Sequence, residues 1–176
     1  MGERRIFLVG AMKAGTTTLH DYLVQHPNIF QQSIKEPQYV SWVTRNEKYF
    51  NYDEGDFKKK AISVIPVRDD TGYEVLYSQA QSGQYLIDSS VFNLPHPPAA
   101  DYIKEKFPDA IILILVRDMT KRAFSSYSFQ KSKGAEWAKT FEKAIEEELD
   151  GLRDGYIYPW RNLFCSKYSQ QIPRYM

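Results

Sequence analysis

Glycine, lysine and threonine residues near the N-terminus form a stretch that could hold a phosphate group. Residues 10–17 read Gly-Ala-Met-Lys-Ala-Gly-Thr-Thr, close to the pattern G-x-x-x-x-G-K-[ST] of nucleotide-binding loops. The glycines would let the backbone approach a phosphate, and the N–H groups that open a following helix would point at it. The lysine is displaced, however: Lys13 lies inside the loop, and Thr16 stands where nucleoside triphosphatases carry their lysine.

The position of Lys13 within the loop affects which kind of phosphate-containing ligand is expected. Kinases and triphosphatases neutralise the β- and γ-phosphates with Mg²⁺, which a carboxylate at a strand end helps to hold. Asp88 could be offered for that role, so a kinase with a shifted lysine stays an alternative. A donor with less charge at its reacting end could be bound by one lysine and several hydroxyl groups, and the loop has both.

A second basic cluster follows the apolar run 110–116. Arg117 comes directly after that run, Arg122 follows, and Ser125 lies about two helical turns beyond Arg117. Lys13, Arg117 and Arg122 are expected to gather at one edge of the sheet and to face an anionic ligand. A guanidinium and a hydroxyl suit a second phosphate, because the planar fork takes two oxygens at once. The alternative is a surface ion pair of Arg117 with Asp118 or another neighbour.

The elements that must position these residues alternate between strands and helices. Continuous apolar runs predict buried strands at 5–10, 85–87 and 110–116, and the last of these is expected in the middle of a parallel sheet with both faces covered. Helical spacing predicts helices over 17–25, 99–107, 119–131 and 136–150, the last with Trp137, Phe141, Ile145 and Leu149 on one face. The fold class is therefore α/β, a three-layer parallel sheet with helices on both faces, and its ligands should bind beyond the carboxyl ends of the strands.

Length and composition limit the remaining possibilities. The 176 residues fit a single domain, and the formal net charge of +1 argues against nucleic-acid binding by bulk charge. The one cysteine, Cys165, excludes an internal disulfide and suits a reducing compartment, so a cytoplasmic location is expected. The longest apolar run, 110–116, is far shorter than the ~20 residues that cross a bilayer, so no membrane partner is expected.

Together the two motifs resemble the sulfotransferases that use 3′-phosphoadenosine 5′-phosphosulfate (PAPS). Residues 7–19 resemble the 5′-phosphosulfate loop of that family, and 116–127 are similar to its 3′-phosphate motif. His26-Pro27 followed by Lys35-Glu36-Pro37 resembles the bacterial and heparan-sulfate branch. The resemblance covers roughly residues 5–131 and, more faintly, 168–171.

The resemblance implies a role for each matching residue. Lys13 would contact the bridging and sulfuryl oxygens and stabilise the leaving phosphate. Backbone and hydroxyl groups of the loop would bind the 5′-phosphate. Arg117 and Ser125 would bind the 3′-phosphate. The implied cofactor-binding residues are Lys13, Ala14, Gly15, Thr16, Thr17, Thr18, Arg117 and Ser125.

Glu36 matches the glutamate that acts as general base in the heparan-sulfate branch. Its place beside Lys35 and before Pro37 would hold it on a stiff turn, from which it could take a proton from an acceptor. The alternative is a surface Lys–Glu pair. No metal ligand is expected, because His20, His26 and His96 show no ligand spacing with Cys165 or with carboxylates.

The implied reaction is in-line, metal-independent transfer of a sulfuryl group from PAPS to a hydroxyl or amine of a carbohydrate or small metabolite, leaving 3′,5′-ADP. The aromatic segment 39–57 is a candidate acceptor wall, with ordinary core as its alternative. A module that binds PAPS or 3′,5′-ADP without catalysis is a second reading. Because family members normally continue beyond the position of Met176 with a loop that covers the cofactor, the chain is expected to lack that portion, and a second subunit could complete the site.

Overall fold

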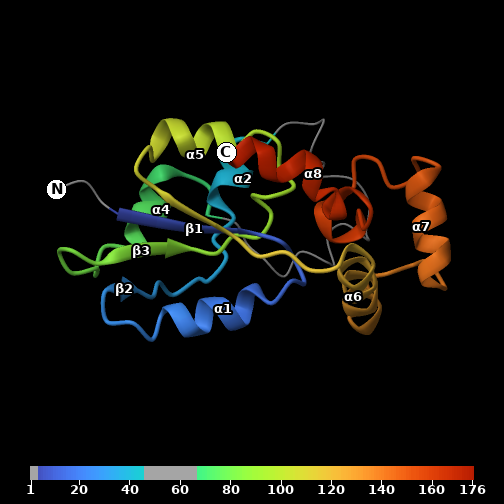
Figure 1. Ribbon diagram of the computed structural model, residues 1–176, viewed down its shortest axis with the longest axis horizontal. Coiled ribbons are helices and arrows are strands. Elements are labelled where there is room, and N and C mark those ends of the chain that lie inside the picture. Colours follow the sequence, from blue (N-terminus) through green and yellow to red (C-terminus); the bar gives the residue numbers. More distant parts are fainter. Residues whose placement is uncertain (1–3, 46–66) are drawn as a thin grey trace.

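The computed structural model describes residues 4–45 and 67–176, and these form a parallel four-stranded sheet flanked by helices (Figure 1). The strands are β1 (Arg4–Gly10), β2 (Ile29–Phe30), β3 (Tyr85–Asp88) and β4 (Ile111–Ile114). They lie in the order β2-β3-β1-β4, so β1 is an inner strand with β3 and β4 as its neighbours. Every pairing is parallel, so the carboxyl ends of all four strands lie along the same border of the sheet, which is called the carboxyl edge below.

Helices cover both faces of this sheet. The helix α1 (Thr16–Leu23) lies on one side, and α2 (Tyr39–Val43), α4 (Asp70–Val75) and α5 (Ala99–Lys106) lie on the other (Figure 1). This arrangement confirms the predicted three-layer α/β class. The predicted strand at 5–10 and the helices at 17–25 and 99–107 are found within two residues of their expected ends.

The core explains why β1 is an unbroken apolar run. Phe7, Leu8 and Val9 are fully buried, because helices lie over both faces of this strand. Phe7 and Val9 join a cluster that includes Tyr39, which stacks on the ring of Tyr73 with centroids 4.0 Å apart. Tyr39 is therefore a core residue, and the acceptor wall expected at 39–57 is wrong at this position.

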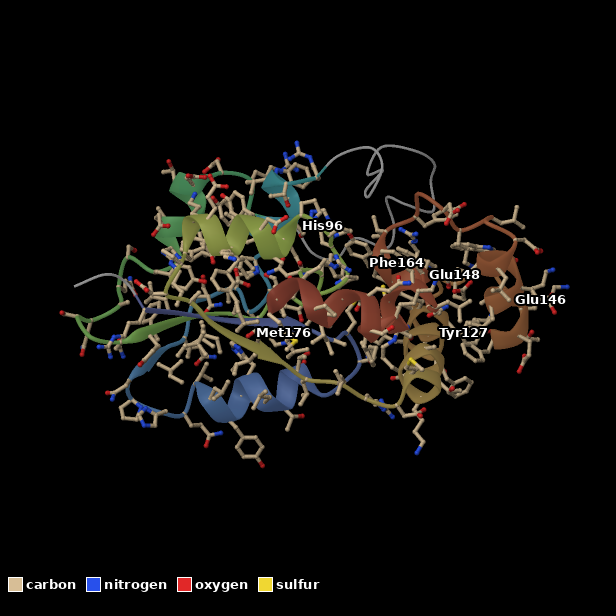
Figure 2. All side chains as sticks on the ribbon, turned by 45° about the horizontal axis from the view of Figure 1, so that its top comes forward. His96, Tyr127, Glu146, Glu148, Phe164 and Met176 are labelled. Atoms are coloured by element: carbon tan, nitrogen blue, oxygen red, sulfur yellow. The ribbon has the colours of Figure 1, made fainter. Side chains whose placement is uncertain are left out.

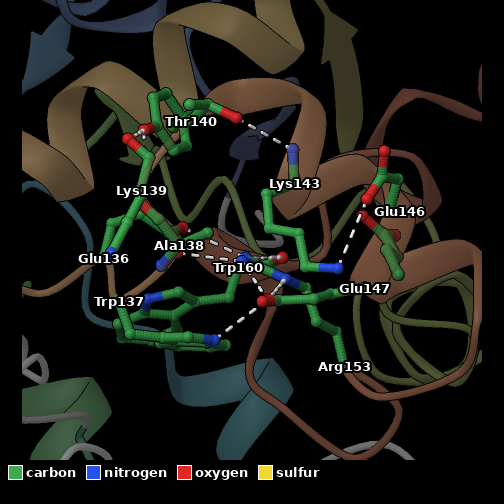
Figure 3. Close-up of polar contacts among 12 residues, drawn as sticks. Glu136, Trp137, Ala138, Lys139, Thr140, Lys143, Glu146, Glu147, Arg153 and Trp160 are labelled. Carbon is green, nitrogen blue, oxygen red and sulfur yellow. Dashed lines mark hydrogen bonds and ion pairs between the residues drawn. The ribbon is translucent and has the colours of Figure 1, made fainter.

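A group of helices beyond the carboxyl edge holds the second motif. It consists of α6 (Met119–Ser132), α7 (Phe141–Leu149) and the 3₁₀ turns η1 (Tyr158–Trp160) and η2 (Phe164–Ser166). The last elements, α8 (Tyr168–Gln171) and η3 (Ile172–Tyr175), lead back toward α5, and Tyr168 and Tyr175 pack against the central core (Figure 1). At the centre of the group, buried Arg153 bonds the carboxylates of Glu136 and Glu147 at 2.8 Å each (Figure 3). Glu148 accepts the backbone N–H groups of Leu163 and Phe164, which fixes η2 against α7 (Figure 2).

The predicted position of residues 110–116 in the sheet is wrong. Among the described strands β4 lies at the edge and pairs with β1 alone, and Ile111 is 44% exposed. Ile112 and Ile114 pack against the central core, so they account for part of the apolar run. Hydrophobicity here indicates contact with the core and not a central place in the sheet.

The helix predicted at 136–150 is shorter than expected. It begins at Phe141, where Thr140 caps it by accepting the N–H of Lys143. Trp137 precedes the helix and donates its indole N–H to Glu147, and Leu149 is 72% exposed. The predicted apolar face is therefore wrong for Trp137 and Leu149, whereas Phe141 does pack inward, against Tyr127 and the buried Ala144.

Candidate active site

The loop between β1 and α1 is fixed at the carboxyl edge by backbone contacts. Ala11 donates to the carbonyl of Leu115 at 2.7 Å, and Leu115 donates back to Gly10 at 2.8 Å. Gly10 lies against Leu94 so closely that a Cβ atom at this glycine would be 2.7 Å from the Leu94 Cβ. The first glycine of the motif is therefore required by packing, and it brings the loop close to the chain that follows β3.

The helix that follows the loop presents its N-terminus to that edge. Gly15 takes a left-handed conformation with φ 97° as the N-cap of α1, and no side chain caps the helix. The first N–H groups of a helix have no partner within it, and here they belong to Thr16, Thr17 and Thr18. Thr16 is buried and the other two are exposed, so the first turn offers backbone donors and hydroxyls together.

Lys13 lies at the middle of the loop, half-buried, with φ 65°. Its Nζ is 4.0 Å from the centroid of the Phe129 ring on α6. Burial lowers the pKa of Lys13, the positive charge of Arg117 lowers it further, and Glu36 acts in the opposite direction. The charges of Arg117 and Glu36 thus both shift the pKa of Lys13, as expected if the three side chains lie close to one another.

Arg117 reaches the loop directly. Its Nη1 donates to the carbonyl of Lys13 at 3.1 Å, while Asp118 caps α6 by accepting the N–H of Lys121 at 2.9 Å. Because the Asp118 carboxylate is used to cap α6, the surface ion pair between Arg117 and Asp118 is disfavoured. Ser125, half-buried, is one turn before Phe129 on α6, so it lies on the side of that helix that faces Lys13.

The segment with Glu36 lies beside the start of α1. The Nζ of Lys35 donates to Thr17 Oγ1 at 3.1 Å and to Glu36 Oε1 at 2.9 Å, and Gln38 Nε2 donates to Glu36 Oε2 at 3.1 Å. The side chains of Lys35 and Glu36 are only 24% and 26% exposed. The Lys–Glu pair considered from the sequence exists, but it is a partly buried part of the loop's surroundings.

Asp88 at the end of β3 is engaged inside the protein. Its carboxylate accepts the hydroxyl of Tyr73 at 2.8 Å and the N–H of Ser90 at 2.9 Å, and the residue is buried. Burial raises the pKa of this carboxyl, so its charged form is disfavoured. Asp88 is therefore poorly placed to hold the Mg²⁺ that a kinase would require.

The three histidines have structural partners. His20 Nδ1 lies 2.8 Å from Ser89 Oγ, His26 Nδ1 accepts the N–H of Asn28, and His96 contacts Thr44 and Tyr158. Within residues 4–45 and 67–176, no three histidine, cysteine or acidic side chains are close enough to hold a metal ion together.

Arg122 corrects one expectation of the sequence. It was expected beside Lys13 and Arg117, facing an anion, but it is fully buried. Its guanidinium donates to Ser166 Oγ at 2.7 Å and to the carbonyl of Asn162. Arg122 thus anchors α6 to the segment around Asn162 and Ser166, and this segment covers its side chain.

Three contacts at the site were missed by sequence reasoning. Gln38 holds Glu36, Lys35 reaches Thr17 as well as Glu36, and Phe129 lies under Lys13. Phe129 lies one helical turn after Ser125, so the sequence could have predicted that both residues lie on the same face of the helix. Of the candidate acceptor wall, the part beyond residue 45 lies outside the described residues.

Comparison with known proteins shows the family and the fold of this chain. A model described as "Sulfotransferase family" matches residues 5–163. The crystal structure of a sulfotransferase from Alicyclobacillus acidocaldarius superposes with a TM-score of 0.84 and 28% sequence identity, covering 99% of this chain and 68% of that one.

A curated relative points to the same family. The membrane-associated sulfotransferase kil1 of Dictyostelium discoideum is 27% identical over an alignment of 148 residues, and the match covers 81% of this chain and 27% of the relative. The chain thus spans about a quarter of the length of that relative. In the described part of this chain, no helix is both long and apolar enough to cross a bilayer. The family match, which spans both motifs and the fold between them, shows that the chain belongs to the sulfotransferase family.

Proposed function

We propose that this protein transfers a sulfuryl group from PAPS to a hydroxyl or amine of a carbohydrate or small metabolite. The observation that carries the proposal is the meeting of three elements at the carboxyl edge: Arg117 bonds the loop at Lys13, and Glu36 lies beside the same loop, tied through Lys35 to Thr17. A cationic loop with a carboxylate beside it suits an anionic donor and an acceptor that must lose a proton.

The residues present suit this donor at both of its phosphates. The uncapped start of α1 and the hydroxyls of Thr16, Thr17 and Thr18 are assigned to the 5′-phosphate. Arg117, which is exposed and lies in the segment between β4 and α6, and Ser125 on α6 are assigned to the 3′-phosphate. The backbone contribution of Lys13, Ala14 and Gly15 completes this set.

When bound, PAPS supplies a sulfuryl group that is activated by its link to the 5′-phosphate. Lys13 is assigned to stabilise the negative charge that develops on the leaving phosphate as the sulfur–oxygen bond breaks. Glu36 is assigned to take the proton from the acceptor while the new sulfur–oxygen or sulfur–nitrogen bond forms. Burial keeps the Lys13 ammonium partly out of water, which strengthens its interaction with an anion. The transfer so described requires no metal ion.

Two other functions remain as outcomes of the test. A module that binds PAPS or 3′,5′-ADP without catalysis would use the same loop and Arg117 but would not need Glu36. A kinase would need a carboxylate for Mg²⁺, and the contacts of Asp88 with Tyr73 and Ser90 oppose that reading.

The transfer of ³⁵S from labelled PAPS to a panel of sugar and phenol acceptors tests the proposal. We expect labelled product with the wild-type protein, and we expect Glu36→Gln to lose transfer but keep its affinity for 3′,5′-ADP, because the amide retains the shape of the side chain but is a poor base. Binding of 3′,5′-ADP without transfer to any acceptor would support the binding module instead. Loss of 3′,5′-ADP binding in Glu36→Gln would contradict the role given to Glu36.

A further inference from the structure

We propose that Lys35 is a positioning residue that couples occupancy of the phosphate loop to the freedom of Glu36. It neutralises Glu36 when the loop holds no anion and transfers its contact to the anion when the donor binds. The inference rests on the proposed function, since it concerns the same loop and the same carboxylate. It adds an order to the reaction, because Glu36 can accept a proton only after the donor has arrived.

The contacts of Lys35 place one ammonium between two functional elements. Its Nζ lies 3.1 Å from Thr17 Oγ1 and 2.9 Å from Glu36 Oε1. Thr17 belongs to the first turn of α1, whose N–H groups are the expected anchor of the 5′-phosphate. An anion at that turn would therefore lie within reach of the same ammonium that now pairs with Glu36.

The backbone around Lys35 is fixed, so the ammonium can change partner without movement of the chain. The carbonyl of Lys35 accepts the N–H of Ser89 at 3.3 Å, and the N–H of Gln38 is bound by Ser90 Oγ at 2.9 Å. Both serines follow β3 and are buried. A lysine side chain has a flexible stem and three equivalent donors, which suits an exchange of partners better than a planar guanidinium does.

Glu36 keeps its place when Lys35 leaves it. Its other oxygen, Oε2, accepts from Gln38 Nε2 at 3.1 Å, and this contact does not involve Lys35. Release of Oε1 would thus give a carboxylate that is still oriented but has an oxygen available for the acceptor. The positive charge of Lys35 also acts on His20 of α1, whose pKa is lowered first by burial and then by this charge.

The ¹³C resonance of the Glu36 carboxyl group measures this coupling without any acceptor. The full chain labelled with [δ-¹³C]glutamate is titrated with 3′,5′-ADP in EDTA, and Glu36→Gln assigns the resonance by its disappearance. In the wild-type protein we expect a shift of the Glu36 resonance that saturates with 3′,5′-ADP. In Lys35→Met we expect about tenfold weaker binding and no shift of this resonance at saturation.

Two further variants make the result specific to the side chain of Lys35. Lys35→Arg keeps the charge but has a planar guanidinium that suits an exchange of partners less well, so it is expected to restore only part of the shift. Lys104→Met on α5 is a matched control that should behave as wild type. An equal shift in Lys35→Met and wild type, with both saturated, would overturn the proposal and leave the proposed function intact. Failure of the wild-type protein to bind 3′,5′-ADP would instead contradict the proposed function itself.

Discussion

Arg117 has two possible contributions, one to the loop and one to the ligand, and these can be separated by choice of nucleotide. Its guanidinium is exposed apart from its contact with the Lys13 carbonyl. If it binds the 3′-phosphate, Arg117→Ala should weaken binding of 3′,5′-ADP by about ten- to a hundredfold, because a charge-assisted hydrogen bond is lost. Binding of 5′-AMP, which has no 3′-phosphate, should change little. Isothermal titration of both nucleotides measures the difference.

Arg4→Ala is the matched control for this experiment, since Arg4 lies at the opposite end of β1 and is also exposed. It should leave both affinities unchanged. An equal loss for the two nucleotides in Arg117→Ala would mean that this arginine supports the loop and does not read the 3′-phosphate.

Sequence reasoning found the parts of the site that are contiguous in the chain. Lys13 and the threonines share one loop, and Arg117 follows a strand, so the general rule for strand ends was enough to bring them together. The contact of Lys35 with Thr17 was not predictable, because it depends on the path by which the chain returns from β2 to the start of α1. Arg122 was misjudged because the segment that buries it, around Asn162 and Ser166, comes much later in the chain.

At the scale of elements, the turn from β1 into the loop depends on the absence of a side chain at Gly10. A methyl group there would meet the Leu94 side chain in the core, so Gly10→Ala should lower the free energy of unfolding by about 1–3 kcal/mol. Urea unfolding followed by circular dichroism measures the change. Affinity for 3′,5′-ADP should fall as well, because the loop must shift away from Leu94.

Gly83→Ala separates this packing effect from backbone strain. Gly83 also has a positive φ, of 90°, but nothing lies within 4 Å of the position that a Cβ would take. We expect Gly83→Ala to be less destabilising and to leave nucleotide binding unchanged. Equal destabilisation by the two substitutions would show that packing against Leu94 is not what requires the glycine.

Hydrophobic patterns predicted which helices and strands exist better than they predicted the position of a strand in the sheet or the first residue of a helix. The run at 110–116 indicated a strand but not its edge position, since sheet order is set by the connections between strands and not by burial alone. The pattern at 136–150 merged an irregular segment with a helix. Thr140, a favourable N-cap residue, was the local signal for the true start.

At the scale of the whole molecule, His96 joins the sheet layer to the C-terminal helices. Its Nε2 lies 2.8 Å from Thr44 Oγ1, and its Nδ1 lies 2.7 Å from the hydroxyl of Tyr158 in η1. Burial lowers the pKa of His96 to about 4, a backbone hydrogen bond at Thr44 acts in the opposite direction, and Arg174 lowers it further. The folded state therefore holds the neutral imidazole at pH 5, whereas the unfolded chain, with a pKa near 6.5, binds a proton.

The sign of the pH dependence follows from this difference. The unfolded state binds more protons between pH 6.5 and 4, so stability from His96 is present above pH 6.5 and is lost as the pH falls toward 4. Between pH 7 and pH 5 the loss should be about 2 kcal/mol. Urea unfolding at the two pH values should show a smaller loss in His96→Gln than in wild type. An identical loss in both proteins would exclude His96 as its source.

The central claim is that the loop of Lys13 and the cationic end of β4 together bind a nucleotide with phosphates at its 3′ and 5′ positions and require no metal. Thermal unfolding with 3′,5′-ADP in EDTA, compared with ATP and Mg²⁺, tests it directly, because a ligand that binds only the folded state raises the unfolding temperature. We predict stabilisation by 3′,5′-ADP without metal, little effect of ATP with Mg²⁺, and a reduced effect of 3′,5′-ADP in Lys13→Ala. Stabilisation by ATP with Mg²⁺ and none by 3′,5′-ADP would contradict the account.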